Sequence, residues 1–204
     1  MVKGEKTFDP NPESTRLAGN VSIRKYREMI QRQDRAAIAD LVQRRFEERY
    51  LDAVLLSSKR HGFAVLSVCC LMVEALESFR QGWPRSDGKS ETAFCAFFEA
   101  HNEFGELRPV AHEFYRAVRC GILHQAETTH GWRVHQGKGP LLVERSGVRW
   151  VSAWEFARRL KAVLGRYRKE LAESDWTSPV WVKTRAKLRS ICRNCGVADV
   201  TGLA

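Results

Sequence analysis

The sequence predicts a mainly α-helical bundle with a small β-hairpin insertion. Apolar residues make up 44% of the 204 residues, which is enough for one domain with a hydrophobic core. Apolar side chains recur at intervals of three and four residues through most of the chain, as expected for helices that bury one face. Residues 131–151 break this pattern with short β-type runs separated by glycine, proline and serine, and they indicate a small β-hairpin or a three-stranded insertion.

The first helices follow a polar start. Residues 1–20 contain Pro, Gly, Asn and Ser without apolar periodicity, and they predict a flexible arm. Ser22 is a candidate N-cap for a helix that reaches about Ser57, with a break near Asp34. A second helix, from about Arg60 to Gln81, is apolar nearly all round in its first half. We therefore expect it to be the central buried helix.

The later helices carry recognisable start signals. Ser90 is expected to cap a helix that ends near residue 104. Pro109 lies where the next helix begins, since its missing N–H costs nothing in a first turn. After the insertion, Ser152 and Glu155 have the spacing of a capping box at the start of a strong helix. A last basic helix begins at Ser178–Pro179.

These elements predict one bundle with two terminal additions. We expect the flexible arm at 1–20, the helical bundle at 21–175 with the insertion at 131–151, and a basic C-terminal helix at 176–204. Four substantial helices joined by short loops are expected to pack antiparallel.

The charge of the chain favours a polyanionic partner. There are 34 Lys and Arg residues against 24 Asp and Glu, a formal net charge of +10. Nucleic acid is the commonest partner of such a field, because neutralising phosphates releases counterions. Arginine suits phosphate because its planar guanidinium forms two parallel hydrogen bonds. The alternative is a basic surface that serves only solubility.

The sequence also favours a cytoplasmic protein without a membrane partner. The first twelve residues are polar and hold two prolines, unlike a signal peptide. The longest apolar run, Phe63–Val73, is shorter than the roughly 18 residues that a membrane span needs. In the cytoplasm, the six cysteines are expected to be reduced thiols. No motif calls for a cofactor.

The segment at 113–127 carries the clearest chemical signal, because it places Arg119 and His124 on one helix. An imidazole near its unperturbed pKa of roughly 6.5 can take a proton from a ribose 2′-OH or give one to a leaving oxygen. A guanidinium can hold the phosphate and stabilise its growing charge. This pair suffices for RNA cleavage without a metal ion.

The run from Arg119 to His124 resembles the Arg-x4–6-His motif of the HEPN superfamily, and the resemblance extends over about residues 35–172. It implies a HEPN-like α-helical bundle that forms a homodimer, with the two motifs meeting at the dimer interface. It also implies a metal-independent endoribonuclease of a toxin–antitoxin or phage-defence system, with RNA as substrate and an antitoxin or defence protein as partner. Arg119 and His124 would be the catalytic pair. Ala126 stands where some HEPN toxins carry a tyrosine.

Four further residues are candidates for supporting roles. Arg116 lies one turn before the motif arginine and would add to a phosphate site, although a solvated charge is as good an interpretation. Gln125 and Glu127 follow the motif histidine and are candidates to bind substrate or to orient the imidazole. Glu74, on the preceding apolar helix, is a candidate ion-pair partner for the motif arginine.

Gly121 predicts a close contact inside the motif. Glycine in a helix costs about 1 kcal/mol relative to alanine, so its presence suggests a packing reason. We expect another helix to approach here, either of the same chain or of a second subunit. Residues five apart on a regular helix point about 140° apart. Arg119 and His124 would therefore meet only through the reach of the arginine side chain, a local bulge or pairing across a dimer.

Three other interpretations compete with the nuclease. Cys120, His124, Cys192 and Cys195 have spacings that would suit a Cys₃His zinc site. The basic helices at 22–50 and 179–193 would suit a non-catalytic nucleic-acid-binding module.

In that module, Trp176 and Trp181 would stack on bases. The third alternative is an interaction scaffold of a defence complex, with Trp132 and Trp150 exposed on the insertion as the partner surface.

Overall fold

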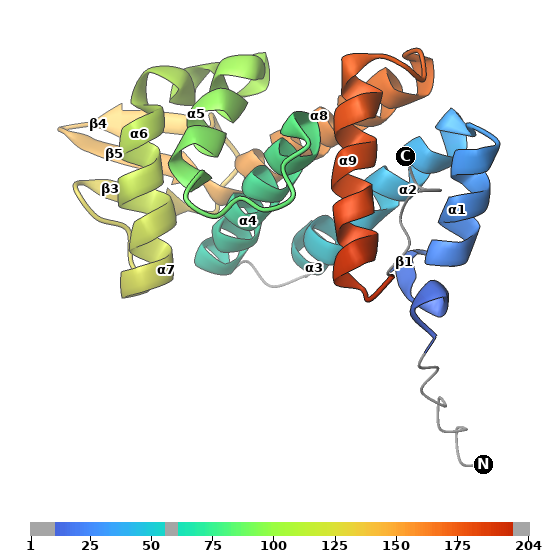
Figure 1. Ribbon diagram of the computed structural model, residues 1–204. Coiled ribbons are helices and arrows are strands. Elements are labelled where there is room, and N and C mark those ends of the chain that lie inside the picture. The colour runs from blue at the N-terminus through green and yellow to red at the C-terminus, as the bar shows by residue number, and fades with distance from the viewer. Residues whose placement is uncertain (1–10, 56–60, 198–204) are drawn as a thin grey trace.

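Helices make up most of the molecule, as the predicted mainly helical class requires (Figure 1). The computed structural model describes residues 11–55 and 61–197. The α-helices are α1 (Ile23–Gln31), α2 (Arg35–Phe46), α3 (Asp52–Leu55), α4 (Gly62–Gln81), α5 (Ser90–Ala100), α6 (Ala111–Phe114), α7 (Gly121–Gln125), α8 (Ala153–Glu173) and α9 (Pro179–Asn194). Two π-helical segments span Glu47–Leu51 and Tyr115–Cys120, and two 3₁₀ segments span Pro12–Ser14 and Asn102–Val110.

The N-terminal segment is folded from residue 12 onward. A short antiparallel pair, β1 (Arg16–Ala18) and β2 (Val21–Ser22), packs on α2, and Leu17 and Ala18 are buried. The expectation of a flexible arm is therefore wrong for residues 12–20. It failed because only two apolar side chains enter the core here, too few to show a period. Residues 1–10 lie outside the described residues.

The first long helix breaks where the sequence predicts. Ser22 caps α1 by accepting a hydrogen bond from the backbone N–H of Lys25 at 3.4 Å. The chain turns at Gln33, whose φ is +50°, and Asp34 then caps α2 through the N–H of Ala37 at 3.0 Å. After α2, the chain passes through the first π segment into α3.

Helix α4 is the central helix, as predicted (Figure 1). It packs against α5, α8 and α9, and side chains such as Leu66, Met72 and Leu76 are fully buried. By length and composition alone α4 is apolar enough to cross a membrane. However, 61% of its apolar stretch is buried inside the fold, so the packing of a core helix accounts for its composition.

The insertion forms a three-stranded sheet that contains the predicted hairpin. Strands β4 (Leu142–Arg145) and β5 (Val148–Ser152) pair antiparallel around the turn at Ser146–Gly147, where both residues have positive φ. Strand β3 (Trp132–His135) pairs parallel to β5, so the strand order is β3-β5-β4.

Trp132 does not lie on a partner surface, because its ring is buried against Phe114; only Trp150 of the predicted pair is exposed. Phe114 belongs to a buried aromatic cluster at the centre of this half of the molecule. Its other members are Phe94, Phe97, Phe98, Phe104 and Phe156.

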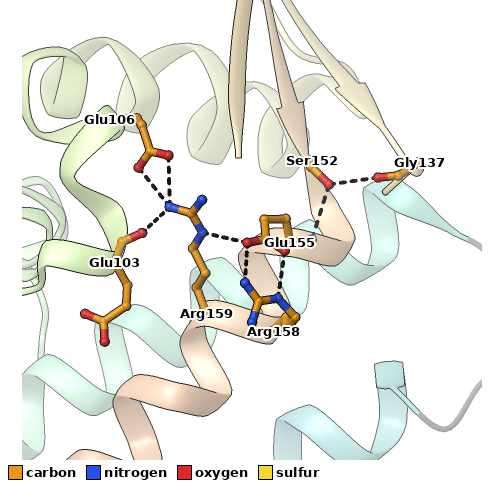
Figure 2. A network of polar contacts seen from close by, with 7 residues as sticks. All are labelled: Glu103, Glu106, Gly137, Ser152, Glu155, Arg158 and Arg159. Atoms are coloured by element: carbon orange, nitrogen blue, oxygen red, sulfur yellow. Dashed lines mark hydrogen bonds and ion pairs between the residues drawn. The ribbon is translucent and has the colours of Figure 1, made fainter. Parts of the chain in front are cut away.

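The start of α8 forms half of the predicted capping box (Figure 2). The hydroxyl of Ser152 accepts from the N–H of Glu155 at 3.2 Å. The carboxylate of Glu155 does not return to the backbone of Ser152; it binds Arg158 and Arg159 at 2.6–2.8 Å instead. Nη1 of Arg159 also donates hydrogen bonds to the carboxylate of Glu106, and this ion pair connects α8 to the 3₁₀ segment Asn102–Val110.

Helix α9 is an integral part of the bundle. It packs along α4, and Trp181 is fully buried with its indole N–H donating to the carbonyl of Leu171 at 2.9 Å. The prediction that Trp181 stacks on bases is therefore wrong. Trp176 is half-buried, between the ring of Trp181 and the guanidinium of Arg185.

Candidate functional site

The candidate site lies on the continuous helix formed by α6, the π segment Tyr115–Cys120 and α7. Within it, the N–H of Gly121 donates to the carbonyl of Val118, which leaves the carbonyl of Ala117 without its usual helical partner. Thr129 supplies one, through its backbone N–H at 3.0 Å and its hydroxyl at 3.4 Å. Short π segments inside α-helices occur often at functional sites. Here the segment contains the motif arginine.

Gly121 permits this arrangement, because the chain that returns after α7 passes directly over it. A Cβ on Gly121 would lie 2.5 Å from the carbonyl oxygen of Glu127 and 3.4 Å from the Cα of Thr128. The predicted close contact is therefore present, but its nature was predicted wrongly. The neighbour is the chain's own loop after α7, and not another helix.

Arg119 is held by the carboxylate that the sequence suggested for it. Its Nε donates to Oε1 of Glu74 at 2.8 Å, and the two side chains are 16% and 10% exposed. The other oxygen of Glu74 accepts from the hydroxyl of Ser90 at 2.7 Å. Ser90 does not cap α5 as expected; it is the first residue of that helix and its hydroxyl turns to Glu74.

The surroundings of Arg119 keep it charged and fix its orientation. Burial opposes the charge of the guanidinium, but the charge and hydrogen bond of Glu74 outweigh it and raise the pKa of Arg119. The guanidinium also lies over the ring of Tyr115, 5.6 Å from its centre. Only Nε is engaged by the carboxylate, so the terminal amino groups of the fork keep donors for an oxyanion.

His124 lies in the last turn of α7 and is exposed. No hydrogen bond or ion pair joins it to Arg119 within the described chain. Arg119 lies inside the π segment Tyr115–Cys120, whereas His124 follows it in α7. The structure thus brings together Arg119 and Glu74, and it leaves the imidazole accessible on the same helix.

The two residues expected to support His124 do not contact it. Gln125 is exposed at the end of α7. Glu127 is used locally: its carboxylate accepts from the N–H of Thr128 at 2.8 Å and from the hydroxyl at 3.3 Å. Among the described residues neither side chain forms a hydrogen bond with His124, and their supporting roles stay predictions.

Arg116 belongs to a second polar cluster that the sequence did not reveal. Its Nε lies 3.4 Å from the carboxylate of Glu91, which also contacts Nδ1 of His112 at 3.0 Å. The thiol of Cys95 lies 3.6 Å from Nε2 of His112. Hydrogen bonding to His112, aided by the charge of Arg116, lowers the pKa of Glu91. These residues come from α5 on one side and from α6 and the π segment Tyr115–Cys120 on the other, and only the packing of the two helices brings them together.

The predicted zinc site is not formed. Among residues 11–55 and 61–197, no group of three His, Cys, Asp or Glu side chains is placed to hold a metal ion. Cys192 is fully buried near the end of α9, where burial raises the pKa of its thiol to about 12. A buried thiol of this kind is a core residue rather than a ligand.

A surface hollow lies beside Glu74. It has a volume of about 400 Å³ and is lined by Glu74, Tyr50, Ser78, Lys187 and the loop at 84–87. The carboxylate that orients Arg119 therefore also borders a space in which a ligand can sit. An arginine that meets its carboxylate through Nε, and an exposed imidazole on the same helix, can bind a phosphodiester and transfer a proton.

Comparison with known proteins gives no match, either to a protein-family model, to a curated protein or to a solved structure.

Proposed function

We propose that this protein is a metal-independent endoribonuclease of the HEPN type, with Arg119 and His124 as its catalytic pair. The observation that carries the proposal is the ion pair between Arg119 and Glu74 of α4. Arg119 lies in a π segment, and the same continuous helix exposes His124 in its last turn. The pairing fixes one edge of the guanidinium and leaves the other for a phosphate. His124 then takes a proton from the ribose 2′-OH or gives one to the leaving oxygen.

The proposal includes a homodimer, because Arg119 and His124 of one chain form no contact. A second copy would bring its own imidazole or guanidinium to the phosphate. Exposed apolar side chains on the elements beside the pair support a protein contact here, namely Phe63 and Leu71 on α4 and Leu123 on α7. Burying such side chains is the main driving force of association.

The biological setting belongs to the same proposal. A cytoplasmic toxin or phage-defence effector, controlled by an antitoxin or another defence protein, follows from the resemblance of the motif. The alternative is a non-catalytic nucleic-acid-binding or interaction module. Arg45, Arg49 and Lys187 line one pocket, and this concentration of positive charge favours binding of nucleic acid in either case.

Cleavage of RNA in EDTA tests the proposal. Wild-type protein should cut total RNA, and His124→Ala should lower the rate by at least about 100-fold, the usual contribution of an acid or base. His130→Asn is a matched control, because His130 is also exposed near the motif and Asn tolerates its φ of +52°. This control should cut RNA like the wild type.

Two further measurements distinguish the nuclease from a binding module. His124→Ala should keep its affinity for RNA in fluorescence anisotropy, and an all-deoxy oligonucleotide should resist cleavage because it lacks the attacking 2′-OH. Undiminished cleavage by His124→Ala would contradict the role of the imidazole. Tight RNA binding by a wild-type dimer that leaves every RNA intact would favour the binding module.

A further inference from the structure

A compact basic pocket lies where α2 and the first π segment meet α9. It has a volume of about 190 Å³. Two arginines of the N-terminal half and one lysine of α9 line it, together with three aromatic side chains. These residues are Arg45, Arg49, Lys187, Phe46, Tyr50 and Phe79.

Within residues 11–55 and 61–197, the hydrogen bonds of the three cations go to backbone carbonyls. Nη1 of Arg45 and Nη2 of Arg49 both donate to the carbonyl of Leu17, at 2.8 and 2.9 Å. Nζ of Lys187 donates to the carbonyl of Pro84 at 3.0 Å. None of the three forms an ion pair with a residue of the described chain, in contrast to Arg44, which pairs with Glu47 and Glu48.

The carboxylates next to these cations in the sequence form ion pairs with other arginines. Glu47 and Glu48 lie in the same stretch of chain, but both pair with Arg44, and Glu48 also pairs with Arg16. The acids of this stretch thus neutralise its outer face and leave the inner one with an excess of positive charge.

The cations of the pocket are partly buried and lie close enough to repel each other. Burial, followed by the charge of Arg49, lowers the pKa of Arg45 to about 10. Burial, followed by the charge of Arg45, also lowers the pKa of Lys187. Burial raises the pKa of Tyr50, so its hydroxyl stays protonated and can donate a hydrogen bond. An anion at this point would relieve the repulsion and accept from all these groups.

We propose that this pocket binds the phosphate group of a nucleotide, either free or within an RNA strand. A guanidinium has five N–H donors, and each arginine here uses one of them on Leu17, so a fork remains for phosphate oxygens. The pocket is too small for a whole nucleotide, since sites for such ligands occupy about 300–1,000 Å³. It holds a phosphate and leaves the remainder outside.

A second hollow, next to the pocket, has space for the sugar and base of the nucleotide. The hollow beside Glu74 shares Tyr50, Ala75 and Lys187 with it. A sugar and base attached to the bound phosphate would extend into this hollow, past the ring of Tyr50, towards the partner of Arg119. The inference stands on the pocket itself and does not require cleavage at His124.

Ligand titrations test the proposal, with three probes of one chemistry: inorganic phosphate, AMP and a twelve-nucleotide RNA. The protein carries His124→Ala, so that RNA stays intact. Arg49→Ala and Lys187→Gln should each weaken binding about 10-fold or more, the effect of losing one charge-assisted hydrogen bond. Arg44→Ala is the matched control, because Arg44 is exposed and ion-paired with Glu47 and Glu48.

The probes distinguish the two sources of phosphate. Tight binding of AMP with weak binding of RNA indicates a free nucleotide. Tight binding of RNA alone indicates a strand, and its affinity should then show a salt slope that falls by about one for Lys187→Gln. The proposal is overturned if no probe binds, or if Arg49→Ala and Lys187→Gln change affinity no more than Arg44→Ala does.

Thermal melting separates a binding role from a structural one. Without ligand, Lys187→Gln should melt at the same temperature as the wild type or higher, because a repulsion is removed. Phosphate should raise the melting temperature of the wild type relative to chloride at equal ionic strength, and it should not raise that of Lys187→Gln. A large loss of stability in Lys187→Gln without ligand would assign the lysine to holding the loop at Pro84.

Discussion

Replacing Gly121 by alanine is expected to destabilise the protein, although glycine is the poorer helix former. Helix propensity alone predicts a gain of about 1 kcal/mol. The new Cβ would lie 2.5 Å from the carbonyl oxygen of Glu127, a separation that real Cβ atoms do not show, so the loop must move. Forcing an extra methyl into a packed place costs about 1–3 kcal/mol.

A second loss follows from the movement of the loop. Thr129 lies two residues after Glu127 and supplies the hydrogen bond that satisfies the carbonyl of Ala117 at 3.0 Å. Weakening that bond costs about 1 kcal/mol. The balance is a net destabilisation of about 1–3 kcal/mol, which corresponds to a fall in melting temperature of about 2–12 °C for a chain of this size.

Gly165→Ala provides the matched comparison. Gly165 lies inside α8, is exposed, and has no heavy atom within 4 Å of its would-be Cβ. It therefore gains helix propensity without a clash and should be more stable by up to about 1 kcal/mol. Thermal and urea unfolding of both variants measure the contrast. If Gly121→Ala proves as stable as Gly165→Ala, the close approach of the loop is not what requires glycine.

Two other predictions concern charged groups in the fold. Glu74→Ala should lower the free energy of unfolding by about 2–3 kcal/mol in urea titrations, since it leaves Arg119 half-buried without its carboxylate. The control, Asp87→Ala, breaks an exposed ion pair and should cost less than about 0.5 kcal/mol. Equal losses in the two variants would contradict the importance of the buried pair. Burial, aided by nearby arginines, lowers the pKa of His101 to about 4 from an ordinary 6.5. On acidification the unfolded chain therefore takes up a proton before the folded one does. The free energy of unfolding should fall as the pH drops from 6.5 to 4, by at most about 3 kcal/mol. His101→Gln should flatten that part of the curve of melting temperature against pH, and an unchanged slope would assign it to other groups.

The helices could be predicted because their signals are local. The cap at Ser22, the break near Asp34 and the burial of α4 all follow from short stretches of sequence. The strand β1 could not be predicted in this way. It is three residues long, and it is held by packing on α2 and by the guanidiniums of Arg45 and Arg49.

The site was predictable only in part, for the same reason. The spacing of Arg119 and His124 is visible in the sequence, and the apolar stripe of α4 pointed to Glu74 as a partner for the arginine. The contact of Ser90 with Glu74 and the cluster of Glu91, His112 and Arg116 depend on how separate helices pack. The hydrogen bonds that Thr129 donates to the carbonyl of Ala117 in the π segment come from a residue twelve positions later in the chain.

The order in which the chain is made has a consequence for α4. This helix is synthesised early, but two of the helices that cover it, α8 and α9, follow only much later in the chain. At about 5–20 residues per second, a nascent chain would present an uncovered apolar helix to the cell for several seconds. Fragments that stop before residue 153 should therefore aggregate or engage chaperones, whereas release of the chain through residue 194 lets the last two helices close over that surface.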